Sequence, residues 1–165
     1  MGNEAILHFF CGKMAAGKST RAKRLAEEVG GVLLVEDELL SQLYPEEIVD
    51  LATYVKYSQR LKGAIANHIR ALLAAGMPVV LDFPGNTLNQ RKWFKELFES
   101  VGVPHRLHYL EVSDEVCKRQ LRERSKGKVE GAAFTSDVEF DAITKYFQPP
   151  TDEEGFHIVR YEARS

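Results

Sequence analysis

The stretch CGKMAAGKST, residues 11–20, follows directly after the apolar run AILHFF and fits the pattern G-x-x-x-x-G-K-S/T. Gly12 and Gly17 let the backbone curl so that successive N–H groups point inward, and the helix that follows adds its positive N-terminal end. The alternative, a glycine-rich turn that only connects a strand to a helix, does not explain a lysine and a hydroxyl at the helix start. The pattern therefore predicts a phosphate-binding loop.

The side chains of this loop predict how a nucleoside triphosphate is held. Lys18 supplies a point charge for the β and γ phosphates, and the Ser19 hydroxyl is a ligand for Mg²⁺. A nucleoside triphosphate with Mg²⁺ is therefore the expected ligand. The nucleotide-binding set that the pattern predicts is Gly12, Lys13, Met14, Ala15, Ala16, Gly17, Lys18, Ser19 and Thr20.

Short apolar runs alternate with helical patterns along the chain. The first predicted helix runs from the GKST turn to a stop at Gly30. Residues 45–75 form one broken helix or two successive ones, with a cap at Asp50 or Thr53. Later helices are expected to start at Asn86 or Thr87, at Ser113 and at Ser136, and the last of them to cover residues 137–147. This alternation favours a parallel sheet with helices on both faces. The predicted strands are 5–11, 32–36, 79–82, 106–112 and 157–161.

Length and composition limit the remaining classes. A chain of 165 residues without repeats or a linker is expected to form one domain, residues 1–165. Its net charge of −2 gives no global basic field for duplex nucleic acid or an anionic membrane. Cys11 and Cys117 stand in no metal-ligand spacing, which fits a reducing compartment. With no signal segment or membrane span in the pattern, we expect a cytoplasmic protein without a membrane partner.

Asp37 follows the second predicted strand and is therefore expected at the carboxyl edge of the sheet, where open parallel sheets bind their ligands. A carboxylate there could accept the proton of an incoming hydroxyl while the γ-phosphoryl leaves the nucleotide. The alternative role is the N-cap of the helix ELLSQL, and the two roles are compatible. The neighbouring acids Glu36 and Glu38 are expected to be turned elsewhere.

Asp82 closes the third predicted strand, in the run VVLDFPGNT. An acid at this place usually orients a Mg²⁺-bound water, so Ser19 and Asp82 are the candidate metal residues. A loop-forming aspartate is the alternative. No second acid follows Asp82, so the chain lacks the DE pair that activates water in many motor ATPases. The sequence therefore favours transfer to a bound acceptor over hydrolysis.

Cations gather where the helix after the fourth predicted strand ends, in the run CKRQLRERSKGK. The polar loop that follows, residues 125–134, is expected to be mobile. Arg124 lies at the junction and could neutralise charge that develops during transfer. A solvated helix end favoured by the dipole is the alternative for each of these cations.

The chain resembles the P-loop kinases of the branch that contains polynucleotide 5′-hydroxyl kinase, chloramphenicol phosphotransferase and the zeta toxins. The resemblance covers nearly the whole chain: the loop from Gly12 to Ser19, Asp37, the run VVLDFPGNTLNQR and an L-x-x-R lid from Leu121 to Arg124. The ending FQPPTDEEGFHIV is similar to a tail in bacterial ATP-binding members. The resemblance implies a three-layer α/β/α fold, a five-stranded parallel sheet in the order 2-3-1-4-5 and a small helical lid. It further implies ATP as the nucleotide, Asp37 as the base and Arg124 as a phosphate contact.

Two positions depart from this family pattern. The branch often has an arginine four residues before the lid arginine, where this chain has Gln120, so Arg119 or Arg122 could act instead. Adenylate-kinase-like enzymes resemble the chain at LDFP but carry an arginine after the proline, where this chain has Gly85. That arginine holds an acceptor phosphate. The absence of this arginine, together with the presence of Asp37, argues for an acceptor that offers a hydroxyl.

The sequence thus predicts an ATP- and Mg²⁺-dependent kinase with Lys18, Asp37 and Arg124 as catalytic residues. Its acceptor is a small molecule or a nucleic-acid 5′ end, and the acidic net charge favours the small molecule. The alternative from another class is a nucleotide-binding regulatory ATPase, a switch with slow hydrolysis. No obligate protein partner is indicated, and the oligomeric state is open. Weaker candidates for contact with the acceptor are Arg60, Asn86 and Arg91.

Overall fold

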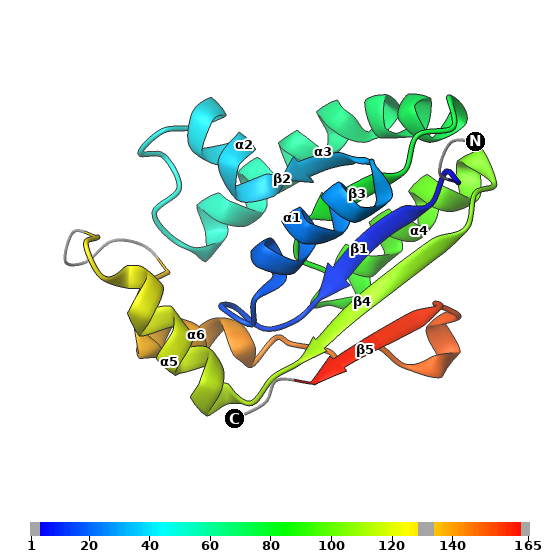
Figure 1. Ribbon diagram of the computed structural model, residues 1–165. Helices are drawn as coiled ribbons and strands as arrows, with labels where there is room; N and C mark the ends of the chain where they lie inside the picture. The colour runs from blue at the N-terminus through cyan, green and yellow to red at the C-terminus, as the bar shows by residue number, and fades with distance from the viewer. Residues whose placement is uncertain (1–3, 129–133, 163–165) are drawn as a thin grey trace.

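The computed structural model describes residues 4–128 and 134–162. Within these ranges, strands pair in parallel in the order β2-β3-β1-β4-β5. This confirms the expected sheet and its order. The strands, shown in Figure 1, are β1 (Leu7–Cys11), β2 (Val32–Val35), β3 (Val79–Asp82), β4 (His105–Glu111) and β5 (Ile158–Glu162).

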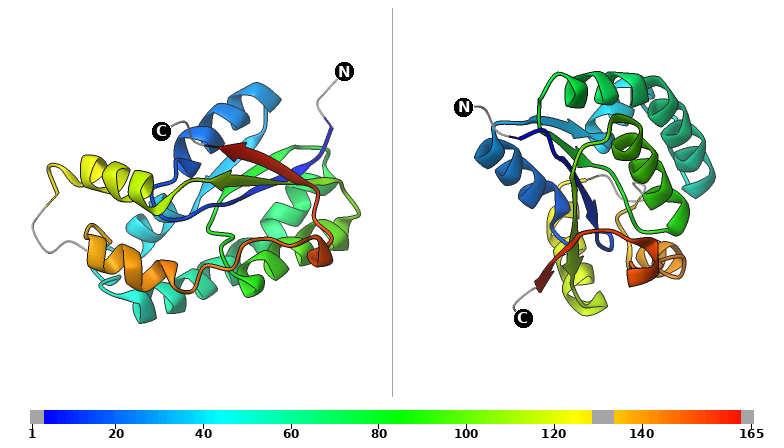
Figure 2. Two further views of the ribbon diagram at one scale, coloured as in Figure 1. Left: turned by 90° about the horizontal axis from the view of Figure 1, so that it is seen from below. Right: turned by 90° about the vertical axis from the view of Figure 1, so that its right-hand side faces the viewer.

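Helices cover both faces of the sheet, as the alternating pattern predicts. Helix α1 (Lys18–Val29) lies against one face, and α3 (Leu51–Ala74) and α4 (Leu88–Val101) lie against the other, as the right-hand view of Figure 2 shows. Alternation along β1 supplies both interfaces, because successive strand side chains point to opposite faces. Phe9 packs with the α3 and α4 side chains, whereas Phe10 packs with the α1 side chains, and both are fully buried.

The other α-helices lie near the carboxyl end of the sheet. Helix α2 (Glu36–Leu43) follows β2 directly and leads into α3. Helices α5 (Asp114–Ser125) and α6 (Asp137–Thr144) project beyond the end of the strands as a small lid (Figure 1). A short 3-10 helix, η1 (Asp152–Glu154), precedes β5. Among the described residues, no helix is both long and apolar enough to cross a membrane.

Side-chain caps set the starts of four helices where the sequence predicts them. Asp50 and Thr53 form a capping box at α3, and Thr87 accepts the backbone N–H of Gln90 at α4. Ser113 caps α5, and Ser136 forms a capping box with Glu139 at α6. These caps satisfy backbone N–H groups that a helix start leaves without partners.

Several predicted boundaries are wrong by a few residues. Glu36 was expected in the second strand, but β2 ends at Val35, which pairs with Asp82 at the end of β3. Residues 45–50 of the region predicted as helical precede α3, which begins after the expected cap at Asp50, and the last helix ends at Thr144 and not at residue 147. Part of the loop expected to be mobile, residues 129–133, lies outside the described residues.

Candidate active site

The loop between β1 and α1 adopts the curled backbone that the motif predicts. Ala15 and Gly17 have positive φ angles of 65° and 101°. Helix α1 starts directly after Gly17, and no side chain in the described part of the protein caps this start or places an acid in its first turn. The backbone N–H groups at the start of α1 are therefore available to an anion such as a phosphate.

Lys18 is the cation of this loop. Its Nζ donates to the carbonyl oxygen of Gly12 at 2.5 Å, so the side chain folds back over the loop. Burial lowers the pKa of Lys18, and the negative charge of Asp82 acts in the opposite direction. A lysine held over the loop in this way can transfer its hydrogen bond from the Gly12 carbonyl to a phosphate oxygen.

The two candidate metal residues meet across the sheet edge. The Ser19 hydroxyl donates to Oδ2 of Asp82 at 2.7 Å, which joins the start of α1 to the end of β3. Burial raises the pKa of Asp82, while the Ser19 hydroxyl and the Lys18 charge lower it. A hydroxyl and a carboxylate are oxygen donors of the kind that Mg²⁺ prefers, and Mg²⁺ usually keeps several waters and substrate oxygens besides one or two such groups. The pair therefore fits a magnesium ion bound with a nucleotide, although no cluster of three or more His, Cys, Asp or Glu occurs in residues 4–128 and 134–162.

Asn86 and Gly85, which follow β3, pack against the end of β1 and the phosphate-binding loop. Oδ1 of Asn86 accepts the backbone N–H of Gly12 at 2.8 Å, so this candidate for acceptor contact holds the phosphate-binding loop. A Cβ atom added at Gly85 would lie 2.3 Å from the carbonyl oxygen of Phe10. An arginine at this position would therefore collide with the Phe10 carbonyl on this backbone.

Asp37 lies in the first turn of α2 and is exposed. The predicted N-cap role is wrong, because Val35 occupies the cap position and gives no side-chain hydrogen bond. Among the described residues, no group donates a hydrogen bond to the Asp37 carboxylate or forms an ion pair with it. Val35, two residues before Asp37, pairs with Asp82, and the negative charge of Asp37 contributes to raising the pKa of Asp82, so both acids lie at the carboxyl edge of the sheet. The role of Asp37 as the base stays a prediction.

Glu36, the residue before Asp37, is buried and fully engaged. Tyr54 and Ser58 of α3 both donate their hydroxyls to its carboxylate, Ser58 at 2.8 Å. Burial raises the pKa of Glu36, and the two hydroxyls lower it. The sequence indicated only that Glu36 turns away from the site. It did not reveal these partners, which are 18 and 22 residues away along the chain.

The cations of α5 separate into two groups. Arg122 forms an ion pair with Asp137 of α6 at 2.7 Å and thereby links the two lid helices. Arg124 is exposed, and its positive charge helps to lower the pKa of Lys18. Of these two arginines, Arg124 is therefore the one whose charge reaches the phosphate-binding loop. Arg119 is also exposed.

The two other candidates for contact with the acceptor lie elsewhere. Arg91 is fully buried in α4, where its guanidinium pairs with Glu154 of η1 at 2.8 Å and donates to the Gly85 carbonyl oxygen at 2.9 Å. This gives Arg91 a structural role. Arg60 is exposed, with its guanidinium 5.5 Å from the centre of the Tyr57 ring.

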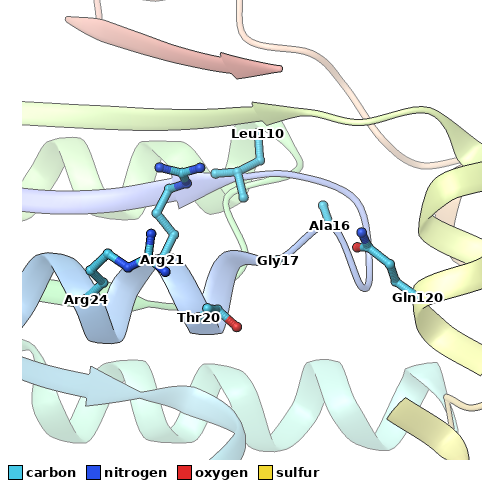
Figure 3. Close-up of a pocket in the computed structure, with 7 residues that line it drawn as sticks. All are labelled: Ala16, Gly17, Thr20, Arg21, Arg24, Leu110 and Gln120. Atoms are coloured by element: carbon cyan, nitrogen blue, oxygen red, sulfur yellow. The ribbon is translucent and has the colours of Figure 1, made fainter. Parts of the chain in front are cut away.

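A cavity of about 350 Å³ opens between the start of α1, the end of β4 and α5. Figure 3 shows that Arg21 and Arg24 border it from α1, while Gln120 faces it from α5. Gln120 is the residue that stands where the family pattern has an arginine. The cavity adjoins the phosphate-binding loop, since its lining is Ala16, Gly17, Thr20, Arg21, Arg24, Leu110 and Gln120.

The sheet order, the curled loop and the Ser19–Asp82 pair together define a nucleotide-binding protein with the P-loop fold. Comparison with protein families identifies the family of the chain. A family model described as an AAA domain matches residues 7–150, and the chain belongs to this family. No curated protein matches the chain by sequence.

Solved structures share the fold at low sequence identity. The Mycobacterium tuberculosis APS kinase CysC, solved with AMPPNP and APS, is 15% identical with a TM-score of 0.63, over 99% of this chain and 91% of that one. Shikimate kinase from Acinetobacter baumannii, solved with shikimate, is 18% identical with a TM-score of 0.59, over 98% and 85%. Kti12 from Chaetomium thermophilum, solved with ADP-AlF3, is 14% identical with a TM-score of 0.66, over 94% and 89%. These likenesses establish a P-loop kinase-like fold.

Proposed function

We propose that the chain is an ATP- and Mg²⁺-dependent phosphotransferase that moves the γ-phosphoryl group of ATP to a hydroxyl of a small-molecule acceptor. Two of the proteins that share its fold are kinases, one solved with AMPPNP and the other with shikimate. The net charge of −2 favours a small molecule over a nucleic-acid end as the acceptor. In this proposal, the nucleotide and the acceptor bind on different sides of the phosphate-binding loop.

The nucleotide side consists of the loop and the cavity beside it. The N–H groups at the start of α1 and the Lys18 ammonium bind phosphate oxygens, and the adjoining cavity receives the ribose and base. Ser19 and Asp82 would hold a magnesium ion that binds with the nucleotide. A bound magnesium ion would neutralise negative charge on the phosphates during the transfer.

One observation carries the transfer to a hydroxyl: the carboxylate of Asp37 is exposed and unpaired among the described residues, beside Asp82. Other acids of this chain have partners: Glu36 accepts hydrogen bonds from hydroxyls, and Glu154 and Asp137 form ion pairs with arginines. An unpaired carboxylate at the carboxyl edge of the sheet can accept a proton from an alcohol. The N-cap alternative for Asp37 no longer competes with this role.

The proposed reaction forms one bond and breaks another. The acceptor oxygen attacks the γ-phosphorus, its proton passes to the Asp37 carboxylate, and the bond between the γ-phosphorus and the oxygen of the leaving ADP breaks. Lys18 and Arg124 supply positive charge where the transferred group develops negative charge. Phe83 follows Asp82 in the sequence, so the chain lacks the second acid that activates water in many motor ATPases.

The test follows γ-labelled phosphate from ATP with Mg²⁺ to a panel of aminoglycosides, chloramphenicol, nucleosides, sugar nucleotides and 5′-hydroxyl oligonucleotides. We expect Asp37→Asn to lower kcat by about 10²- to 10⁴-fold, the usual contribution of a general base, with ATP affinity unchanged. Glu47→Gln, which neutralises an exposed acid of the α2–α3 connection, is the matched control and should retain full activity.

Two results would contradict the proposal. Transfer at the wild-type rate in Asp37→Asn would remove the base from the mechanism. Label that goes only to water, at equal rates in wild type and Asp37→Asn, would favour a regulatory ATPase instead. Label on an oligonucleotide alone would keep the kinase but replace the small-molecule acceptor by a nucleic-acid end.

A further inference from the structure

The Lys62 ammonium group of α3 contacts an aromatic ring but has no hydrogen-bond acceptor or anion among the described residues. Its Nζ lies 5.3 Å from the centre of the Trp93 ring of α4. Burial lowers the pKa of Lys62, and the negative charge of Glu36 acts in the opposite direction. An ammonium group has three N–H donors, yet no hydrogen bond or ion pair engages this one in residues 4–128 and 134–162. Lys62 is half-buried, so water reaches it only in part, and a cation over an aromatic ring is stabilised only in part when it lacks an anion there.

The nearest acid does not supply the missing anion. The Glu36 carboxylate accepts hydroxyls from Tyr54 and Ser58, which occupy its two oxygens separately. Residues 54, 58 and 62 are spaced four apart and therefore follow one another along a single face of α3. Lys62 thus continues the row that faces Glu36, one turn beyond Ser58, but leaves the carboxylate to the hydroxyls.

This row belongs to the side of the loop where the proposed acceptor binds. Glu36 directly precedes Asp37, and its charge also reaches Lys18. Trp93, under the Lys62 ammonium, stacks on Phe83 with ring centres 5.5 Å apart, and Phe83 directly follows Asp82. The Lys62 ammonium is thus connected to the two strand ends that carry Asp37 and Asp82: through the charge of Glu36 to the first, and through the Trp93 and Phe83 rings to the second.

We propose that Lys62 binds an anionic group, a phosphate or a carboxylate, of the acceptor alcohol. This inference rests on the proposed function and deepens it, because it gives the acceptor a charge. Without Lys62, the carboxylates of Glu36 and Asp37 would repel such a molecule. With it, one anionic group anchors the acceptor against Lys62 and the Trp93 ring, and the hydroxyl is left free to reach Asp37.

The other cations of α3 differ in a way that supplies controls. The Lys56 ammonium and the Arg60 guanidinium lie 5.3 Å and 5.5 Å from the centre of the Tyr57 ring, and both residues are exposed. Water can solvate both of them. Lys56 is therefore a lysine of the same helix, also placed over an aromatic ring, that lacks the burial which makes Lys62 unusual.

The first experiment needs no transfer. The protein is saturated with AMPPNP and Mg²⁺ so that the triphosphate site is filled, and acetylation of each lysine by a limiting amine reagent is quantified by peptide mass spectrometry. Inorganic phosphate and acetate are the probes, with chloride at equal ionic strength as the reference. We expect one of the two anions to slow acetylation of Lys62 at least about fivefold and to leave Lys56 unchanged. Protection by phosphate assigns a phosphorylated acceptor, and protection by acetate assigns a carboxylated one. Equal labelling of Lys62 in phosphate, acetate and chloride would overturn the inference.

The second experiment uses pairs of alcohols that differ only in a charged group, such as glycerol with glycerol 3-phosphate and ethylene glycol with glycolate. Lys62→Met should lower kcat/KM for the charged member by at least about tenfold and leave the uncharged member and the KM for ATP unchanged, as the loss of a charged hydrogen bond predicts. Lys62→Arg, which keeps the charge, should restore part of the loss, and Lys56→Met should have no effect. A wild-type preference for the uncharged members would contradict the inference. Protection of Lys62 together with transfer that survives Asp37→Asn would instead overturn the base mechanism and leave the anion site standing.

Discussion

The phosphate end and the acceptor end of the site differ in how the fold satisfies their charged and polar groups. At the phosphate end, Lys18 bonds to the Gly12 carbonyl and Ser19 bonds to Asp82. At the acceptor end, Asp37 and Lys62 have no hydrogen-bond or ion-pair partner among the described residues. The chain itself thus partners the two side chains named at the phosphate end, whereas the described residues leave those at the acceptor end without a partner. Substitutions at the two ends should separate nucleotide binding from transfer.

Lys18→Met provides the largest expected contrast. Losing the charged hydrogen bonds to phosphate should weaken ATP binding roughly 10- to 100-fold, and losing the charge during transfer should lower kcat/KM by at least about 10³-fold. Asp37→Asn should bind ATP as tightly as wild type. Calorimetric titration with AMPPNP and Mg²⁺ measures both affinities. If Asp37→Asn loses as much nucleotide affinity as Lys18→Met, the division of the site into two ends is wrong.

Arg91→Met tests how far the phosphate end depends on its buried support. Removing the guanidinium leaves Glu154 without its partner and Gly85 without a donor, so we expect a loss of about 3 kcal/mol in the free energy of unfolding. Urea denaturation measures this loss. Arg70→Met, which removes only the outer contacts of Arg70 to Asn67 and Ser100, should cost less than about 1 kcal/mol. Equal losses in the two variants would show that the buried pair does not brace the loop.

Glu36→Gln tests whether the partnered acid of the acceptor end is structural. Because burial raises the pKa of Glu36 above its ordinary value of 4.5, the folded chain binds this proton more tightly than the unfolded chain does. The free energy of unfolding of the wild type therefore falls as the pH rises from 4.5 through the raised pKa, and Glu36→Gln escapes this loss.

We expect Glu36→Gln to match the wild type near pH 4.5 and to melt a few degrees higher at pH 8, as thermal unfolding followed by circular dichroism would show. Glu47→Gln, at an exposed position, should follow the wild-type curve. A melting temperature for Glu36→Gln below that of the wild type at pH 8 would mean that the ionised carboxylate, bonded to Tyr54 and Ser58, stabilises the fold.

The same contrast explains how much of the molecule could be predicted from the sequence. The loop has a fixed spacing of glycines, lysine and hydroxyl because a phosphate imposes it, and the alternation of strands and helices implies the sheet. The meeting of Ser19 and Asp82 follows, because both lie at the carboxyl edge.

The residues of the acceptor end, and the buried contacts of Arg91 and Gly85, have no such pattern in the sequence. The pairing of Arg91 with Glu154 joins residues 63 positions apart, and it depends on how α4 packs against η1. Gly85 could be recognised from the sequence only as a missing arginine, whereas the structure shows the Phe10 carbonyl in its way. Lys62 could be told from Arg60 only after α3 was packed against Trp93. Helix packing, and not spacing along the chain, decides these contacts.

Lys13→Met is the smallest expected effect and the closest comparison with Lys18→Met, because both lysines belong to the phosphate-binding loop. The Lys13 ammonium pairs with Asp114 at the start of α5, at 2.6 Å, and both side chains reach solvent. An exposed pair of this kind contributes at most about 1 kcal/mol and weakens as salt screens it. We therefore expect a change in the free energy of unfolding of less than about 1 kcal/mol and an affinity for ATP within about threefold of wild type. Urea denaturation and nucleotide titration at low and high salt measure the two quantities. If Lys13→Met weakened ATP binding as strongly as Lys18→Met at both salt concentrations, position in the loop rather than contact with the Gly12 carbonyl would decide which lysine binds phosphate.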